Sequence, residues 1–226
     1  MNLKLPLIVS LVLVAVMAAF SAWGWNIIPD TAQLPIHWGW NGDADRFAAK
    51  VPGLLMMPGL GLVLTAFFGL WPAIEPRRRN LVSSRKLYTV GWLGGLGVLT
   101  VAHILVVVNA SGTRIDVGEA ALVSAAVLIA VMGNFFGKTR SNFTAGIRTP
   151  WTISSDYSWE RTHRWGGRLF VVTGVAALGA LLVAGRRFGF EVLIGGVLVT
   201  TVTSIVLSYV YWRRDPARHA QDGVPE

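Results

Sequence analysis

The chain has 226 residues, of which 53% are hydrophobic and only 14% are charged. Soluble domains of this size carry about a quarter charged residues, so this composition argues against an ordinary soluble protein and indicates a membrane protein. The sequence contains no cysteine, which excludes disulfides and thiolate metal sites.

Six apolar runs follow one another along the chain, and each is long enough, or nearly so, for the roughly 20 helical residues that cross a bilayer core. They are 5–28, 52–75, 87–108, 118–136, 169–185 and 190–212. The first run is longer than the apolar core of a secretory signal, so we interpret it as a transmembrane helix. The sequence therefore predicts an all-α, polytopic membrane protein with six transmembrane helices.

The positive charges are divided unequally between the two sides of this predicted bundle. Five of the 20 lysines and arginines lie on one side, namely Arg46, Lys50, Arg114, Arg186 and Arg187. The other 15 lie at the amino-terminal end, in the connections 76–86 and 137–168, and in the carboxyl-terminal tail. Positively charged loops stay in the cytoplasm, so we expect both termini to be cytoplasmic. This topology explains the net charge of +8, and we expect no direct binding of nucleic acid.

The predicted helices contain few polar groups. His103 is the only ionisable side chain well inside a run, whereas ion-coupled transporters usually need buried acids or bases as relays. We expect His103 to form a hydrogen bond to a neighbouring helix. Gly91 and Gly95 have the spacing that lets helices approach closely, and TTVTS at 200–204 can form hydrogen bonds between helices. A small transporter or channel lined by His103 and these threonines is the alternative function.

The largest predicted external connection, 29–50, reads PDTAQLPIHWGWNGDADRFAAK. Its WNGDAD string is typical of a turn. His37, Asp43 and Asp45 are residue types that bind metals, but their spacing matches no defined site, so we expect no metal and no other cofactor. Trp38, Trp40 and Phe47 are expected at the level of the lipid headgroups. There they form either a lid that an apolar ligand meets first or a simple aromatic belt.

The predicted cytoplasmic connection, 137–168, combines basic and aromatic residues. Ser155 is a good N-cap and Asp156 a good first-turn acid, so the sequence predicts a short interfacial helix at 156–168 that leads into the fifth run. Thr149 is predicted to cap a second helical turn that starts at Pro150.

Arg148 presents a planar fork of hydrogen-bond donors, suited to carbonyl groups at helix ends or to Asn134 and Asn142. Two interpretations of the segment around it stay open. In the first, Arg148 is pinned under the bundle as a structural plug, with Trp151 as its wedge. In the second, the same residues dock a partner protein.

Several strings of this half of the chain resemble the SdpI family of bacterial immunity proteins. They are GN at 133–134, Asn142, GIRTPWT at 146–152, Trp159, TH at 162–163, and the basic, aromatic ending SYVYWRR at 208–214. The site residues that the resemblance implies are Asn134, Asn142, Gly146, Arg148, Thr149, Pro150, Trp151, Thr152, Trp159, Thr162 and His163.

The first connection is similar to a small domain of unknown function that often precedes the SdpI core. The residues that match its pattern, with a neighbouring tryptophan, are Pro35, His37, Trp38, Gly42, Asp45 and Lys50. We therefore expect a transmembrane hairpin at 1–75 with the external loop 29–50, followed by a four-helix core at 76–226 with the cytoplasmic loop 137–168.

The resemblance implies a non-enzymatic immunity or resistance protein of the bacterial cell membrane, with a secreted peptide toxin and the lipid bilayer as partners. It also implies a second role, in which the toxin-bound protein holds a small transcriptional repressor at the membrane.

Overall fold

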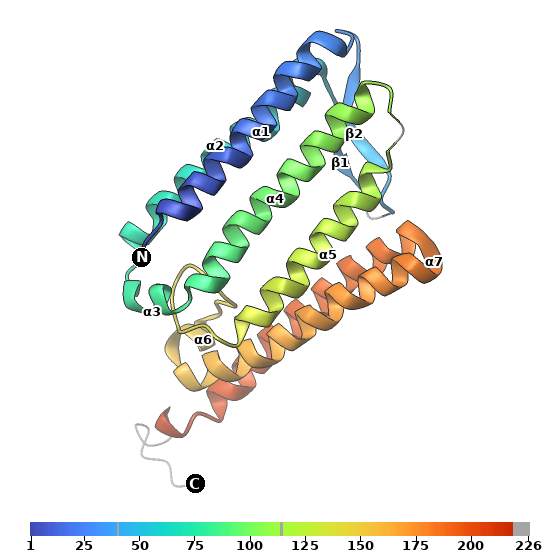
Figure 1. The fold of residues 1–226 in the computed structure, drawn as a ribbon. Helices are drawn as coiled ribbons and strands as arrows, with labels where there is room; N and C mark the ends of the chain where they lie inside the picture. The colour runs from blue at the N-terminus through green and yellow to red at the C-terminus, as the bar shows by residue number, and fades with distance from the viewer. Residues whose placement is uncertain (40, 114, 219–226) are drawn as a thin grey trace.

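A computed structural model describes residues 1–39, 41–113 and 115–218. Trp40 and Arg114, which the sequence analysis assigned to the external side, lie outside the described residues. The described elements, shown in Figure 1, are α1 (Lys4–Ile27), β1 (Gln33–Trp38), β2 (Ala44–Ala49), α2 (Lys50–Ile74), α3 (Arg78–Ser83), α4 (Arg85–Ala110), α5 (Val117–Phe136), α6 (Pro150–Ser154) and α7 (Asp156–Arg213).

Five helices within the described residues, α1, α2, α4, α5 and α7, are long and apolar enough to cross a membrane. α7 is folded back on itself at Gly185, whose φ of 83° and ψ of 179° are available to glycine but strained for other residues. Its first arm, 156–184, and its second arm, 186–213, lie antiparallel, since Thr173 is bonded to Thr200 and Ser158 to Ser208. The polytopic membrane fold is confirmed, and the two arms contain the fifth and sixth predicted runs. The count of six crossings stays a prediction.

The predicted helix at 156–168 is present and leads into the fifth run, but it is the beginning of α7 rather than a short helix of its own. The first arm of α7 continues through these residues without a break. The reason is packing, because one face of this stretch is buried against α5. A side-chain carbon at Gly167 would lie 2.5 Å from the carbonyl oxygen of Gly133, so the two backbones touch where only glycine fits.

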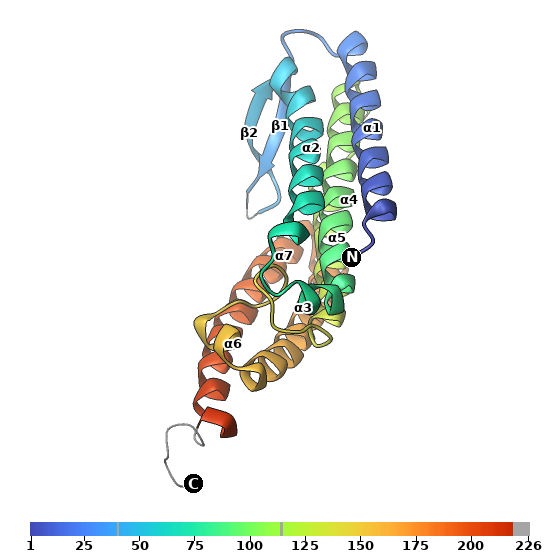
Figure 2. The same cartoon turned by 90° about the vertical axis from the view of Figure 1, so that its left-hand side faces the viewer.

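A two-stranded antiparallel hairpin, which the all-α prediction omitted, covers one end of the bundle. β1 pairs with β2 from Gln33 opposite Ala49 to Trp38 opposite Ala44. Figure 2 shows the hairpin beside α2, with β2 on the outside. Leu34 is fully buried against α2 and belongs to an apolar cluster with Leu54 and Val107. An inserted side chain thus holds the hairpin against the helices, although the sheet has only two strands.

The bundle has two packed halves. α1, α2 and α4 contact one another, α5 packs on both arms of α7, and α4 joins the halves through its contact with α5. The sequence analysis expected close helix packing at Gly91 and Gly95 without naming the partner helix. In the structure α4 contacts α5 closely at Gly94, where a side-chain carbon would lie 2.4 Å from the Leu128 side chain, whereas nothing lies within 4 Å at Gly95.

The polar groups inside the bundle bridge neighbouring helices, as predicted. His103 Nε2 lies 2.9 Å from the Ser21 hydroxyl of α1, and Thr200 bonds Thr173 between the arms of α7. α5 lies between α4 and α7, so His103 and Thr200 belong to different helix interfaces. The structure does not bring them onto one path.

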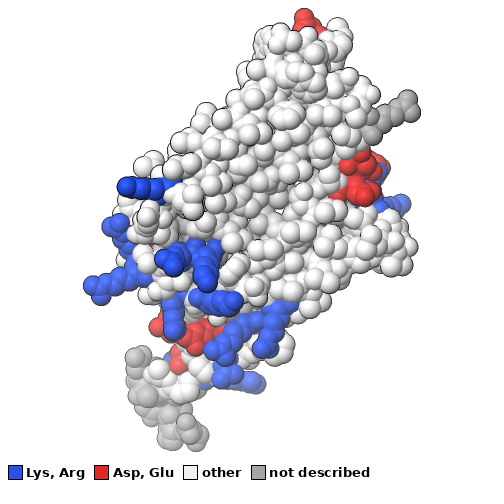
Figure 3. Space-filling view, viewed as in Figure 1, with Lys and Arg blue, Asp and Glu red and all other residues white. Residues whose placement is uncertain are grey.

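Lysines and arginines gather at the end of the molecule where both termini lie (Figures 1 and 3). The opposite end carries the β-hairpin and the turn of α7, and the long surface between them is almost free of charge in this view. By the positive-inside rule the basic end is expected in the cytoplasm. We call it the inner end and the hairpin end the outer end.

Candidate functional site

The first candidate site is the inner hub, which we define as residues 138–155 together with the buried side chains of Phe136, Trp159 and His163. Trp159 and His163 are each 1% exposed, and their rings stack with centroids 4.0 Å apart. Phe136 of α5 also stacks with His163, with ring centroids 5.9 Å apart. The indole of Trp159 donates to the carbonyl of Thr139 at 3.2 Å. The hub is therefore built around an aromatic stack at the junction of α5 and α7.

The side chain of His163 holds the backbone just before the RTPW segment, which we define as residues 148–151. Its Nδ1 lies 2.7 Å from the carbonyl of Trp159, and its Nε2 accepts the backbone N–H of Ile147 at 2.8 Å. A nitrogen that faces a carbonyl must carry the proton, so the imidazole is the neutral Nδ1–H tautomer. Gly146 makes this contact possible: it has a φ of 135°, and a side-chain carbon there would lie 2.4 Å from His163 Nε2.

The predicted helix start at Pro150 is confirmed. Thr149 and Thr152 form a reciprocal capping box, and Pro150 occupies the first turn. Thr149 also donates to Ser208 of the second arm of α7 at 2.9 Å, and Trp151 packs edge-on against Tyr209. α6 therefore ties the hub to the end of the last helix.

The predicted cap at Ser155 is also confirmed. Its hydroxyl accepts the N–H of Ser158 and donates to the carboxylate of Asp215 at 2.5 Å. Asp215 follows the last turn of α7, so this contact links the beginning of α7 to the chain beyond its end. Thr162 is buried too, and its hydroxyl has no hydrogen-bond partner within the described residues.

Asn142 organises the loop before α6. It is completely buried, its amide group donates to the carbonyls of Arg140 and Ala145, and its oxygen accepts the N–H groups of Thr144 and Ala145. Buried backbone groups need such partners, and Asn142 supplies four of these bonds in a loop that has no regular secondary structure.

Arg148 and Asn134 lie outside this buried network. Arg148 is exposed, and its guanidinium donates to the carbonyl of Phe143 at 2.6 Å. This carbonyl belongs to the loop, and is neither one of the helix-end carbonyls nor one of the asparagines to which the sequence analysis assigned the guanidinium. Asn134 is exposed on the last turns of α5.

Glu75 and Arg77, which the sequence analysis did not single out, bond the loop to the end of α2. Glu75 is 4% exposed and accepts the N–H groups of Arg77 and Phe143 and the hydroxyl of Thr144. Arg77 donates to the Ser141 hydroxyl and to the carbonyl of Ile153. A signal existed in the sequence, because Glu75 is the only acid in the basic stretch 75–86.

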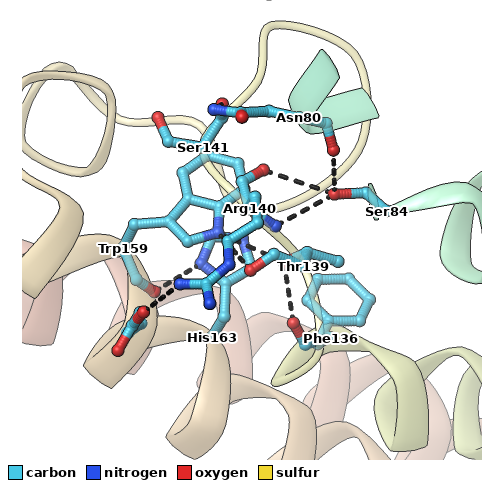
Figure 4. A network of polar contacts seen from close by, with 9 residues as sticks. Asn80, Ser84, Phe136, Thr139, Arg140, Ser141, Trp159 and His163 are labelled. Carbon is cyan, nitrogen blue, oxygen red and sulfur yellow. Dashed lines mark hydrogen bonds and ion pairs between the residues drawn. The ribbon is translucent and has the colours of Figure 1, made fainter. Parts of the chain in front are cut away.

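A second set of contacts fastens the loop to α3 and the beginning of α4 (Figure 4). Asn80 donates to the carbonyl of Ser141 at 2.7 Å, and the Ser84 hydroxyl accepts the N–H of Arg140 at 3.0 Å. Arg140 also forms an ion pair with Glu160 of α7. The loop is thus held by side chains of α3 and α7 and of the connections next to them, which fix its backbone at the inner end.

The second candidate site is the outer hairpin. His37 and Asp45 face each other across the strands, with Nδ1 and Oδ1 2.6 Å apart. This hydrogen bond holds the pKa of Asp45 below its usual value. Gly42 occupies the turn with a φ of 81°. The residues that suggested a metal site therefore pair within the hairpin or, in the case of Asp43, with Arg186.

Lys50 anchors the base of the hairpin. It is 7% exposed, and its ammonium group donates to Asp30 at 2.8 Å and lies 5.6 Å from the ring centre of Trp25. The contact lowers the pKa of the Asp30 carboxyl, chiefly through the hydrogen bond from Lys50. The matched lysine of the sequence pattern is thus a structural cation.

Arg186, at the turn of α7, clamps the tip of the hairpin. It donates to the carbonyl of Gly42 at 3.0 Å, to Asp43 at 2.5 Å and to Asp116 at the beginning of α5 at 3.0 Å. Beside this clamp lies a groove of about 600 Å³ between the hairpin and the outer ends of α4 and α5. Its walls include Pro35, Trp38, Phe47, Asn109, Asp116 and Val117. The groove is open, partly aromatic and charged at one end, which suits a peptide-like ligand.

Comparison with known proteins matches both halves of the chain. Residues 138–212 match the SdpI/YfhL protein family, and residues 12–62 match a domain of unknown function, DUF1648. The carboxyl-terminal half of the chain is thus similar to the SdpI/YfhL family. The chain is also 21% identical over 210 residues to the immunity protein SdpI of Bacillus subtilis (strain 168). The matched region covers 92% of this chain and 96% of SdpI. No solved structure matches.

The two matches coincide with the two candidate sites. The SdpI/YfhL segment contains most of the inner hub and both arms of α7, and the DUF1648 segment contains the outer hairpin. The predicted division at residue 75 agrees with this order along the chain, although α1 and α2 pack directly on α4. That division stays a prediction.

Proposed function

We propose that this protein is an immunity protein of the bacterial cell membrane that protects against a secreted peptide toxin without catalysing a reaction. The observation that carries the proposal is the similarity to immunity protein SdpI, which extends over 92% of the chain and so includes both the hairpin and the hub. A similarity limited to the helices would follow from membrane composition alone.

The outer groove is the place that we assign to the toxin. It lies at the end that the charge distribution directs away from the cytoplasm, and its aromatic wall and its charged end offer contacts to both parts of an amphipathic peptide. Phe47, 54% exposed on β2, is the aromatic side chain that such a peptide would cover.

The test is a challenge of a strain that lacks the gene with candidate peptide toxins, with and without the protein expressed. Expression of the wild type should raise the inhibitory toxin concentration. Phe47→Ser should remove most of this gain, whereas Phe188→Ser, which changes a similarly exposed phenylalanine outside the groove, should keep it. Equal toxin sensitivity with and without the wild-type protein, for every candidate toxin, would reject the proposal.

The second role that we propose is recruitment of a cytoplasmic repressor to the inner end. The observation that favours it is that Phe143, Arg148 and Pro150 are exposed while the backbone that carries them is held rigidly. A rigid loop with exposed groups is a good docking surface, because binding then costs little ordering entropy. Trp159 contributes to this role only through the fold, since it is buried.

The variant Arg148→Ala distinguishes a docking role of Arg148 from a purely structural role as a plug. It should abolish co-purification of the regulator while the amount of protein in the membrane and its thermal stability stay unchanged. The matched control is Arg161→Ala, which changes an exposed arginine of α7 that is not part of the RTPW segment. Loss of the folded protein on Arg148→Ala would support the plug instead.

A further inference from the structure

We propose that the interface between α4 and α5 binds one anionic phospholipid at the inner end, with the headgroup in a basic pocket and an acyl chain in an apolar groove above it. The proposal rests on two cavities that follow one another along the same pair of helices.

The first cavity is a basic pocket of about 350 Å³ between the beginning of α4 and the end of α5. Three cations, Arg85, Lys86 and Lys138, line it, together with the hydroxyl-bearing residues Ser83, Ser84 and Thr139. All three cationic residues are exposed, and within the described residues none of them forms an ion pair with a carboxylate. The pocket therefore concentrates positive charge that the protein itself does not neutralise.

The second cavity is a groove of about 500 Å³ whose walls are apolar apart from two hydroxyls. On α4 its lining runs from Val90 through Gly94 and Gly97 to Val101, and on α5 it runs from Val131 through Val127 to Ser124. Three of the valines, Val101, Val127 and Val131, are about 40 to 45% exposed on the lipid-facing surface.

The two cavities share one face of each helix. On α4 the lining residues are spaced by four, seven and four residues, which places them in one row along the helix: Lys86, Val90, Gly97 and Val101. Phe135 of the pocket and Val131 of the groove are four residues apart on α5. A ligand that follows this interface therefore passes from three cations to an apolar channel over about one helical turn.

This order of chemistry fits a phospholipid. Basic pockets between transmembrane helices on the cytoplasmic side bind anionic headgroups, because a phosphate is attracted by several cations at the membrane surface. A free phosphate would use only the pocket, and a helix of a second copy would use only the groove. A single anionic lipid occupies both.

Gly97 is the residue that keeps the groove open. Nothing lies within 4 Å of the position that its side-chain carbon would take, so a larger residue fits there without displacing the protein. Gly95 has equally open surroundings but does not line the groove, which makes it a matched control.

The experiment measures lipid binding by native mass spectrometry of the full chain released from nanodiscs with equal parts of phosphatidylglycerol and phosphatidylcholine. The wild type should retain one phosphatidylglycerol per chain. Gly97→Leu should lose it and Gly95→Leu should keep it. The triple variant Arg85→Gln, Lys86→Gln, Lys138→Gln should bind on the order of 100-fold more weakly, since each cation near the surface contributes about a factor of five. The control Arg161→Gln, Arg164→Gln, Arg168→Gln removes three exposed arginines of α7 and should bind normally.

Three results would overturn the proposal. They are equal retention of phosphatidylcholine and phosphatidylglycerol by the wild type, normal lipid retention in Gly97→Leu, and a wild-type dimer that Gly97→Leu converts to a monomer without a change in bound lipid. All variants are compared only as monodisperse preparations. If Gly97→Leu does not fold, the triple variant of Arg85, Lys86 and Lys138 decides: normal phosphatidylglycerol binding by this variant would then overturn the proposal.

Discussion

At the scale of single residues, the inner hub depends on positions where the side chain is small because a neighbour needs the space. Gly146 is the clearest of them, since the ring nitrogen of His163 occupies the volume next to its backbone. The N–H of Ile147, just before the RTPW residues 148–151, can bond His163 only because residue 146 has no side chain and adopts a positive φ.

Gly146→Ala is expected to destabilise the protein by about 2 kcal/mol or more, because it adds backbone strain and pushes His163 away from Ile147. The measurement is thermal unfolding in detergent. Gly179→Ala is the control, since this exposed glycine of α7 has nothing within 4 Å and an ordinary helical conformation. Equal melting temperatures for Gly146→Ala and the wild type would show that the contact with His163 has no effect on stability.

The His37–Asp45 pair makes the hairpin sensitive to acid. The pKa of Asp45 is lower in the folded protein than in the unfolded chain, so its contribution to stability is present above a pH of about 4 and is lost as the pH falls through the folded value. Hydrogen exchange of the strand amides should therefore accelerate below this range in the wild type beyond the intrinsic pH effect. In Asp45→Asn this additional acceleration should be absent; its persistence would assign the acid sensitivity to another group.

At the scale of elements, the loop 138–149 behaves as a structured part of the bundle although it contains no helix or strand. Its backbone groups bond to Asn142 within the loop and to Glu75, Ser84 and His163, side chains that reach it from different parts of the chain. A sequence analysis identifies the helices that flank such a loop, but not the long-range partner of each N–H group.

Glu75→Ala is expected to loosen this loop, since it leaves two N–H groups and one hydroxyl without their acceptor, at a cost of about 1–3 kcal/mol for each buried group. Trypsin should then cut after Arg140 or Arg148 faster than in the wild type. Glu160→Gln, which breaks an ion pair with a partly exposed arginine, should change the cleavage rate little. Similar cleavage rates for both variants would contradict the role of Glu75.

At the scale of the whole molecule, the unequal charge of the two ends determines the expected orientation. The chain has no native cysteine, so a single introduced cysteine reports on one position only. An impermeant maleimide should label Ala49→Cys on intact cells, whereas it should label Ser154→Cys only after lysis, because these exposed residues lie at opposite ends. The reverse pattern would invert the topology and place the hub outside.

Much of the fold could be predicted from the sequence. Apolar length located the long helices, and the caps at Thr149 and Ser155 were found because capping is a local interaction. The hairpin was missed because its stability depends on Leu34 entering a space between distant helices and on Arg186, more than a hundred residues away. The sequence also did not distinguish buried from exposed residues of the motif: Trp159 is in the core, whereas Arg148 is at the surface.

Arg186 has a mechanical consequence. It joins the tip of the hairpin to the bend of α7, and from that bend the second arm reaches Ser208, about 33 Å further along the helix axis. The hairpin and the RTPW segment are thus bonded to opposite ends of the same helical arm. A displacement of the outer tip would therefore act on the second arm, whose inner end is bonded to Thr149.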